Sequence, residues 1–350
     1  MISNPTPQRA LRGSMPQRPT PRIAASGEHH AQLAPRLTTR DRWLARILHE
    51  HTVLTSRQIA ELAFPSLHAA NERLLPLYRW RIVDRFQPFI GSGAAPMHYV
   101  LDIAGAAVLA FEDGLNADEI GYRHDRAVGV ASSLRLAHTV AVNGFFTALV
   151  AAARAPGATG RLRAWWSETR CRRYFGDIVH PDAFGRWHER GNGVHHEVEF
   201  FLEYDWGTEP LSKVTRKLAD YARLREVTGR TTPVLFCFPT TRRETTARTA
   251  LHRVLTGLDD PAAVPVATTA VDLTTPERAR HPATARWLPL PLHETGRLPL
   301  TGLAHLWPAP PPENPSSTTV TPPARLDRRL RPPSPMQPPP QQPRPGGEPT

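Results

Sequence analysis

The sequence predicts an α+β protein in which two folded units lie between proline-rich tails, and three observations support this fold class. Residues 37–102 contain three amphipathic helical segments followed by two extended segments. Residues 128–290 follow the order helix, three strands, helix, strand, which is typical of a mixed sheet with helices on its faces. Residues 1–36 and 291–350 are rich in proline and poor in aromatic residues, so we expect them to be disordered. A linking helix is expected over 103–127.

The charge of the chain indicates a polyanionic partner. The formal net charge is +11, and a strongly basic protein most simply binds nucleic acid. Five of these positive charges lie in residues 1–40 and three in residues 315–350, which leaves three for the folded middle. Charge alone therefore does not locate the binding surface.

The cysteine count and the apolar runs predict a cytoplasmic protein that does not enter a membrane. Two cysteines, Cys171 and Cys237, are too few for a disulfide framework and fit a reducing compartment. The N-terminal residues lack the apolar core of a secretion signal. The longest apolar run, 140–153, is interrupted by Asn143 and Gly144 and is too short to span a bilayer.

The first unit is predicted to begin with three helices. A first helix capped by Thr38 or Thr39 runs to Glu50, with apolar residues along one face. A second, short helix covers 54–62 and opens with a capping signature. A third runs over 67–80 and presents polar side chains outward.

Two strands, 81–88 and 97–102, are expected to follow, joined by a turn whose tip is 91–96. Pro76 should strain the third helix or end it late. This layout is that of a winged helix-turn-helix, which places its third helix in the major groove of DNA. A winged helix can also serve protein contacts, but the outward Asn and Arg residues of the third helix favour double-stranded DNA. The candidate DNA contacts are Arg57, Ser66, Asn71, Arg73, Arg79 and Arg81.

The second unit is predicted to start with a long helix over 127–153. Its apolar positions are expected to pack on the sheet that follows. The further elements expected, in chain order, are strands at 162–166, 178–184 and 194–205, a helix at 211–227, a strand at 233–239, a helix at 241–255 and a strand at 264–272.

Three carboxylates are predicted to meet on this sheet. Asp182 lies on one strand, and Glu203 and Asp205 lie two residues apart on the next, so their side chains share a face. Carboxylates this close resist ionising together unless a positive charge sits among them. Their hard oxygen atoms suit Mg2+, for which Mn2+ can substitute. The alternative is a set of independent surface carboxylates, against which the largely apolar strand before Glu203 argues.

Both lysines of the chain follow this acidic strand. Of 43 Lys and Arg residues, only Lys213 and Lys217 are lysine, and both fall in the predicted helix 211–227. The ammonium group is a compact charge whose pKa shifts readily near reacting groups. Both are therefore candidates for a site with the three carboxylates.

The spacing of these residues resembles that of a known nuclease superfamily. Pro181-Asp182, twenty intervening residues and then Glu203-x-Asp205 are similar to the PD-(D/E)xK motif on an αβββαβ core. With the upstream winged helix, residues 37–290 resemble the replication-relaxation family of actinobacterial plasmids and other mobile elements. The segments that carry this resemblance are 136–143, Trp166-Ser167-Glu168, 180–182, 203–209 and Lys217-Leu-x-x-Tyr221. The chain departs from the nuclease motif at Asp205, where lysine is usual, and at Trp206, where a basic residue is expected.

The resemblance implies a metal-dependent site. Asp182 and Glu203, with Asp205, would hold one Mg2+ that polarises a phosphate and lowers the pKa of a bound water. Lys217, or else Lys213, would take the place of the missing lysine. Glu168 could reach the site from the first strand.

Two functions stay open. One is a DNA-binding protein of plasmid or mobile-element replication, with a degenerate nuclease-like domain. The other is a Mg-dependent endonuclease or nickase that uses Asp182, Glu203, Asp205 and Lys217. A homodimer is among the oligomeric states that the sequence leaves open, and the tails are candidates for contacts with other replication proteins or with DNA.

Overall fold

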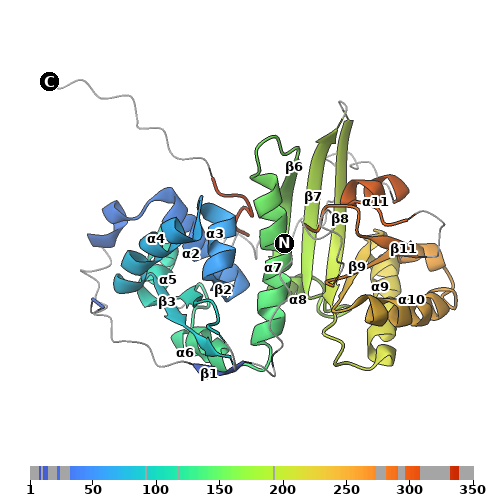
Figure 1. Ribbon diagram of the computed structural model, residues 1–350, viewed down its shortest axis with the longest axis horizontal. Helices are drawn as coiled ribbons and strands as arrows, with labels where there is room; N and C mark the ends of the chain where they lie inside the picture. The colour runs from blue at the N-terminus through green and yellow to red at the C-terminus, as the bar shows by residue number, and fades with distance from the viewer. Residues whose placement is uncertain are drawn as a thin grey trace.

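The structure is a computed structural model that describes residues 8, 11–14, 22–23, 32–90, 93–116, 119–191, 194–272, 281–290, 296–307 and 332–338. In Figure 1 the N-terminal helices lie on the left, the long helix α7 stands in the centre, and a sheet with further helices lies on the right. The expected α+β class is confirmed.

Three helices open the N-terminal unit: α2 (Thr39–His51), α3 (Ser56–Ala63) and α4 (Leu67–Arg79). Each begins directly after a serine or threonine whose side chain accepts a hydrogen bond from a backbone N–H of the first turn. These caps explain why the predicted helix starts agree with the structure within one or two residues. Pro76 lies inside α4, which ends three residues later.

A small antiparallel sheet completes this unit, in the order β2-β5-β3. Its strands are β2 (Leu54–Thr55), β3 (Val83–Phe86) and β5 (His98–Leu101). β3 and β5 form the hairpin that the sequence predicts. Residues 91–92, at the predicted tip of the turn, lie outside the described residues.

The prediction of a disordered tail over 1–36 is wrong for its described parts. β1 (Arg12–Ser14) pairs with β4 (Pro88–Phe89), just after β3. The backbone N–H of Ile23 donates to the carbonyl oxygen of Arg79 at 3.0 Å. These segments therefore lie along the N-terminal unit.

The expected linking helix over 103–127 is two separate helices. α5 (Ile103–Glu112) is largely buried against α2, so it belongs to the core of the N-terminal unit. α6 (His124–Gly129) is one and a half turns long and has no buried residue. A short connection, parts of which are described, separates them.

The predicted continuous helix over 127–153 is wrong, because the chain breaks between α6 and α7 (Leu136–Ala153). Ser132 Oγ donates to the carbonyl oxygen of Gly129, and Ser133 Oγ accepts from the backbone N–H of Arg135. Hydroxyl groups that bond to nearby backbone compete with helical hydrogen bonds in this way. Leu134, expected in the core, is 85% exposed. The short 3-10 turns are η2 (Ala34–Arg36), η3 (Val130–Ser132) and η4 (Pro261–Ala263).

Helix α7 lies between the two units (Figure 1). Among the described residues it is the one helix whose length and composition would allow it to cross a membrane. However, 61% of that 18-residue window is buried inside the protein. Its apolar character is thus accounted for by contacts with the sheet and with α3.

The main sheet has six strands in the order β11-β10-β9-β8-β7-β6. β6, β7 and β8 are antiparallel neighbours, β8, β9 and β10 are parallel, and β11 is antiparallel to β10. The strands are β6 (Gly160–Ser167), β7 (Ala183–Gly191), β8 (Val194–Tyr204), β9 (Val234–Phe238), β10 (Val266–Ala270) and β11 (Leu288–Leu290).

One predicted strand is misplaced. The segment 178–184 was expected to be extended, but β7 begins at Ala183. Before it, α8 (Glu168–Phe175) forms where no helix was expected, and the backbone N–H groups of Ile178 and Val179 bond to the carbonyl of Phe175. These apolar residues close the turn after α8 and do not belong to the sheet.

Each face of the sheet has its own core. On one face Phe146 of α7 stacks on Trp165 and Phe200, and this cluster is continuous with the core of the N-terminal helices. On the other face α9 (Leu211–Thr228) and α10 (Thr241–Leu255) cover a second cluster, which includes Phe201. Consecutive strand residues point to opposite faces, so Phe200 and Phe201 enter different cores.

Parts of the predicted C-terminal tail, 291–350, are also folded. α11 (Leu300–Leu306) packs on β8 and buries Leu300 and Leu303. In the segment 332–338, the carbonyl oxygen of Ser334 accepts a hydrogen bond from Trp43 Nε1 at 2.7 Å. Met336 packs against the core of the N-terminal unit. The prediction of disorder is wrong for both segments.

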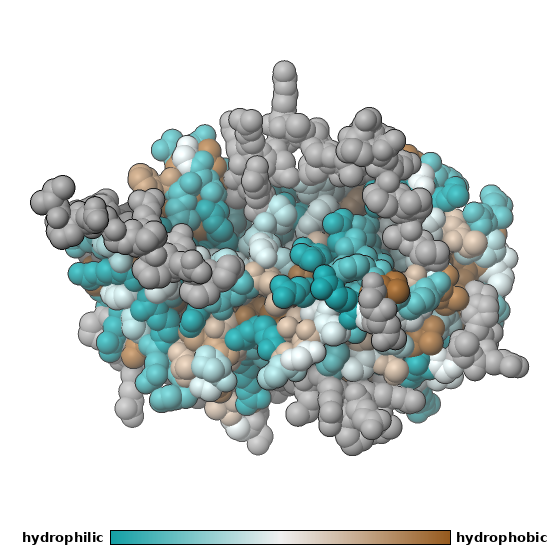
Figure 2. Space-filling model, turned by 90° about the horizontal axis from the view of Figure 1, so that it is seen from above, coloured by the Kyte–Doolittle hydropathy of each residue, from teal (hydrophilic) through white to brown (hydrophobic). Residues whose placement is uncertain are grey.

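The face in Figure 2 is largely hydrophilic, and hydrophobic residues appear on it only as small, separate patches. Large exposed hydrophobic side chains are scattered over several elements of the described chain, with Phe111 and Leu134 the most exposed. Single exposed hydrophobic residues are normal on protein surfaces. The apolar patterning of the sequence is therefore used mainly in the two cores.

Candidate functional site

Asp182 and Glu203 lie side by side at one end of the sheet. β7 starts at Ala183, whose partner on β8 is Leu202, so Asp182 stands opposite Glu203. Side chains directly opposite on antiparallel strands share a face, with Cβ atoms about 5 Å apart. The backbone N–H of Tyr204 donates to Asp182 Oδ2 at 2.8 Å, which fixes this carboxylate. Asp182 is only 9% exposed and Glu203 2%.

Two side chains of α9 bind the carboxylate of Glu203. Lys217 Nζ lies 2.5 Å from Oε2, and the Tyr221 hydroxyl donates to Oε1 at 2.6 Å. Lys217 and Tyr221 are four residues apart, so they project from the same face of the helix. Burial raises the pKa of Glu203 to about 7, with the neighbouring charge of Asp182 adding to the rise and Lys217 opposing it.

The same charges act on Lys217. Burial alone would lower the pKa of its ammonium group, but Glu203 and then Asp182 raise that pKa above its ordinary value. Lys217 therefore stays positively charged in the site.

His138 of α7 is the partner of Asp182. Its Nε2 lies 2.9 Å from Asp182 Oδ1. Burial would lower the pKa of His138, but the charge of Asp182 raises it above its ordinary value. Burial would conversely raise the pKa of Asp182, and His138, followed by Lys217, lowers it. From the sequence we expect a packed-core or helix-surface role for His138, whereas the structure places its ring against Asp182.

Asp205 is turned to a different partner. β8 ends at Tyr204, and Asp205 follows in a turn. Its Oδ2 accepts from Arg243 Nε at 2.8 Å, and its Oδ1 accepts from the backbone N–H of Gly207. Asp205 thus ties the end of β8 to the first turn of α10.

A cavity of about 1220 Å3 is lined by His138, Asp182, Glu203, Asp205, Lys217 and Arg243. The first turns of α7, α8 and α9 contribute Arg135, Glu168 and Lys213 to its wall. Glu168 pairs with Arg135 at 2.9 Å, and Lys213 pairs with Glu209 at 2.5 Å. Lys213 is 54% exposed in its side chain and has its own acid partner, so of the two lysines it is Lys217 that reaches Glu203.

The described residues contain one group of three acidic or histidine ligand atoms within 4.8 Å of one another, and it lies elsewhere: Asp84, Asp102 and His124. The guanidinium group of Arg22 contacts both of these carboxylates. Arginine therefore supplies the cation for this cluster. Asp182, Glu203 and Asp205 do not form such a group of three.

The six candidate DNA contacts are in different environments. Asn71 and Arg79 are exposed on α4, and Arg57 is exposed on α3. Ser66 caps α4 by accepting from the backbone N–H of Ala69.

Arg73 was predicted to point outward, and this is wrong. Its Nε donates to Asp41 Oδ1 at 3.0 Å, and its Nη2 to Oδ2 at 2.5 Å, while Asp41 is 1% exposed. Its guanidinium also lies over the ring of Trp80. Arg81 has a positive φ of 61° and lies 3.4 Å from Asp102.

Three residues of the site were given no role in it from the sequence: His138 and Tyr221, which lie only in segments that carry the family resemblance, and Arg243. The signal for Tyr221 is its position four residues after Lys217, one helical turn further on the same face. His138 and Arg243 carry no comparable signal, because they reach the site from α7 and α10, which are far from their partners Asp182 and Asp205 in the sequence.

Comparison with protein families gave a match to the family described as replication-relaxation, over residues 46–241. The match covers more than half of the 350 residues, including α3, α4, α7 and every strand and helix that holds Asp182, Glu203 and Lys217. Comparisons with curated proteins and with solved structures gave no match. The chain therefore belongs to the replication-relaxation family.

Proposed function

We propose that the chain is a DNA-binding protein of plasmid or mobile-element replication that contacts double-stranded DNA through a winged helix-turn-helix. The observation that carries this proposal is the arrangement of α2, α3 and α4 with the small sheet β2-β5-β3. In a winged helix the third helix enters the major groove and the hairpin contacts the backbone. Membership of the replication-relaxation family agrees with action on DNA.

Helix α4 has the exposed side chains that such a contact needs. Asn71 and Arg79 are exposed, and Asn and Arg are the side chains that pair with adenine and guanine edges in the major groove. Arg73 is held by Asp41 and therefore supports the position of α4, not a base contact. The first test is anisotropy of a labelled DNA duplex with Asn71→Ala and Arg79→Ala, each of which should weaken binding by about 1–3 kcal/mol. Unchanged binding in both variants would refute a DNA contact through α4.

A second candidate function, Mg-dependent cleavage of DNA, is favoured by the contact between Lys217 and Glu203 opposite Asp182. A PD-(D/E)xK-like site needs two carboxylates and a lysine, and here the lysine comes from α9. Burial raises the pKa of Glu203 to about 7, so its ionised form is poorly stabilised in the protein alone. A divalent cation would stabilise that ionised form, and oxygen atoms of Asp182 and Glu203 are ligands of the kind it takes.

The roles of the side chains follow from their contacts. When bound, Mg2+ supplies a Lewis acid for a phosphate oxygen and a bound water of lowered pKa. Lys217 stays charged and would neutralise charge that develops on the phosphate. Tyr221 and His138 orient Glu203 and Asp182, respectively. Asp205 is committed to Arg243, so we assign it a structural role.

Supercoiled plasmid incubated with Mg2+, Mn2+ or EDTA tests this second function. If cleavage occurs, Glu203→Ala and Lys217→Ala should abolish nicking. Lys213→Ala is the matched control, since Lys213 lies one turn away and pairs with Glu209. Plasmid that is retarded but intact in every lane would leave DNA binding as the function and exclude cleavage.

A further inference from the structure

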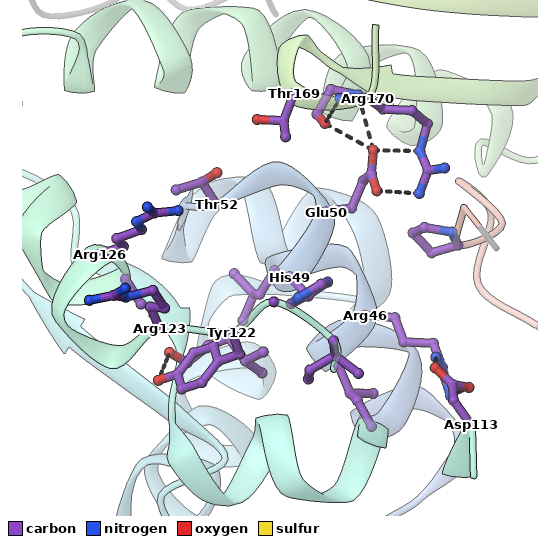
Figure 3. Close-up of a pocket in the computed structure, with 18 of the residues that line it drawn as sticks. Arg46, His49, Glu50, Thr52, Asp113, Tyr122, Arg123, Arg126, Thr169 and Arg170 are labelled. Atoms are coloured by element: carbon purple, nitrogen blue, oxygen red, sulfur yellow. Dashed lines mark hydrogen bonds and ion pairs between the residues drawn. The ribbon is translucent and has the colours of Figure 1, made fainter. Parts of the chain in front are cut away.

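A second cavity, of about 260 Å3, lies between the N-terminal unit and α8 (Figure 3). We name it the α6–α8 cleft. In Figure 3, Arg123 and Arg126 lie together on the α6 side, while Thr169 and Arg170 lie across the cavity on α8. Arg123 and Arg126 line one side of the cleft, and Thr169, Arg170 and Arg173 line the other. His49 and Thr52 line it at the end of α2.

The cleft holds positive charge that no described acid neutralises. Arg170 pairs with Glu50 at 2.7 Å, and Arg46 pairs with Asp113 at 2.8 Å, so these guanidinium groups are compensated. The side chains of Arg126 and Arg173 make no hydrogen bond or ion pair to any described residue, and both are exposed. They come from opposite walls, which makes them available to one anion between them.

A third arginine adds to this charge. Among the described residues Arg123 pairs with Asp125, at 3.3 Å, and both side chains are more than half exposed. An exposed pair of this kind contributes little and exchanges partners readily. The side chain of Arg123 is therefore also available to an anion.

The backbone at the cleft is held in an uncommon conformation. Thr52 has φ 70° and ψ −53°, and the backbone N–H of Val53 donates to the carbonyl oxygen of His51 at 2.8 Å. This is a γ-turn with positive φ, which is rare and strained for a β-branched residue. Asn143 Nδ2 of α7 donates to the carbonyl oxygens of both His51 and Val53, at 3.1 and 2.7 Å. Strain that a buried side chain maintains is often found at binding sites.

The size of the cleft selects a small anion. Pockets for drug-sized ligands are usually about 300–1,000 Å3, and this one lies just below that range. Burial lowers the pKa of His49, and the positive charges of Arg173 and Arg46 lower it further against the opposing effect of Glu50. His49 is then a neutral hydrogen-bonding group beside the arginines, so the anion is bound mainly by guanidinium groups. A phosphodiester group meets these conditions, because arginine binds two of its oxygen atoms at once.

Helix α8 joins the cleft to the cavity of Asp182 and Glu203. Glu168, at the start of α8, lines that cavity, and Arg173, five residues on, lines the cleft. An eight-residue helix is about 12 Å long. The phosphates of one DNA strand are about 3.4 Å apart along the helix axis and further apart along the winding strand itself, so α8 lies beside about two phosphates of a strand that follows it. A strand that passes along α8 can place one phosphate in the cleft and another near the carboxylates.

We infer that the α6–α8 cleft binds one backbone phosphate of DNA between Arg126 and Arg173. This inference rests on the proposed DNA-binding function and deepens it, since it adds a contact outside the winged helix. The bound phosphate belongs to the strand that continues over α8 toward Asp182 and Glu203. The contact is independent of base sequence, because it is made to the backbone alone.

The test is the salt dependence of binding of the full chain to a labelled 30-base-pair duplex. The variant is Arg126→Ala with Arg173→Ala, and the matched control is Arg223→Ala with Arg253→Ala, two exposed arginines on α9 and α10. Loss of one phosphate contact should reduce the slope of log K against log salt by about 0.9. If the two proteins bind equally at 1 M salt, this slope change makes the affinity of the variant about eightfold weaker at 0.1 M salt. The control pair should leave both quantities unchanged, and the paired Arg→Lys changes in the cleft should restore most of the slope.

Other outcomes separate this inference from the function on which it rests. Wild-type slope and affinity in the cleft variant, with binding still weakened by Arg79→Ala, would overturn the phosphate site and leave the winged helix as the DNA contact. An equal loss in the control pair would also overturn it, since the effect would then follow from net charge alone. If the wild-type chain binds no duplex at low salt, the proposed function itself fails, and the cleft assignment fails with it.

Discussion

His51, at the last position of α2, is fully buried, and neither of its ring nitrogens has a hydrogen-bond partner among the described residues. Its ring stacks on Trp165 with centroids 3.5 Å apart. Burial lowers the pKa of this histidine to about 3. The residue therefore packs as a neutral aromatic ring at the contact between the two units.

This burial predicts a stability that depends on pH. When folding lowers the pKa of a histidine, its contribution to the free energy of unfolding is fully present above the unfolded pKa, near 6.5. That contribution is lost as pH falls toward 3, because the unfolded chain binds the proton first. Between pH 7 and pH 5 the loss amounts to about 2 kcal/mol. His51→Phe keeps the stack on Trp165 and should remove this loss in urea unfolding at the two pH values. His68→Gln, at an exposed position, is the control, and a pH dependence unchanged by His51→Phe would contradict the assignment.

The candidate site was predictable to the extent that strand geometry decides it. Asp182 and Glu203 meet because they flank paired strands, and Lys217 meets Glu203 because α9 covers the same face. The same alternation led to the expectation that Asp205 would join them. Asp205 lines the same cavity, but its carboxylate pairs with Arg243, because β8 ends at Tyr204 and the period of two holds only while the strand continues.

Among the elements, α2 and α8 are joined by a buried ion pair. Glu50 Oε1 accepts from Arg170 Nε at 2.9 Å, and Oε2 accepts from Nη2 at 2.7 Å. Ser167 Oγ donates to the same carboxylate. Burial alone would raise the pKa of Glu50, but the hydrogen bonds and charge of Arg170 lower it to about 2.

The lowered pKa of Glu50 implies that this link is lost in acid. A carboxylate whose folded pKa is lowered stabilises the protein above its unfolded pKa, near 4.5, and that contribution disappears as pH falls from there through 2. The shift corresponds to about 3 kcal/mol. Glu50→Gln should cost a similar amount at pH 7, because it removes the negative charge that faces the buried guanidinium group of Arg170. Denaturant unfolding measures this, with Glu197→Gln, from an exposed pair 3.8 Å apart, as a control expected within about 0.5 kcal/mol of wild type. An equal effect of the two changes would argue against the link.

The extents of the elements show where local sequence is a sufficient guide. α2, α3 and α4 were predictable because each follows a residue of a typical N-cap type, namely Thr38, Thr55 and Ser66, respectively. The sequence predicts a strand at Ile178 and Val179 because both residues are apolar. Apolar residues can also close a turn after a helix, as these two do after α8. α8 carries a helical signal that the sequence analysis passed over: Ser167 caps it, and Cys171, Tyr174 and Phe175 are spaced i, i+3 and i+4.

At the scale of the whole molecule, one hydrophobic core runs through both units. It contains residues of α2 and α5, crosses α7 at Phe145 and Phe146, and continues to the α7 face of the main sheet. The sequence predicts two domains joined by a linker. Because described residues of both units share this core, we expect the stability of each unit to depend on the other.

We therefore expect the two units to unfold in a single transition. Far-ultraviolet circular dichroism and tryptophan fluorescence should give coincident melting curves. Phe146→Ala, which removes a ring in contact with Trp165 and Phe200, should cost about 3–5 kcal/mol and shift both curves together. Two resolved transitions, or a shift in only one probe, would contradict a common core.

The position of α7 in that shared core has a consequence for geometry along a DNA molecule. The separation between α4 and the cavity of Asp182 and Glu203 is set by packed side chains, since the core is continuous from one to the other. If α4 binds a base sequence as proposed, any DNA contact or cleavage at the cavity of Asp182 and Glu203 occurs at a constant number of base pairs from that sequence. Adding half a helical turn of DNA between the two positions would move the second one to the opposite side of the duplex.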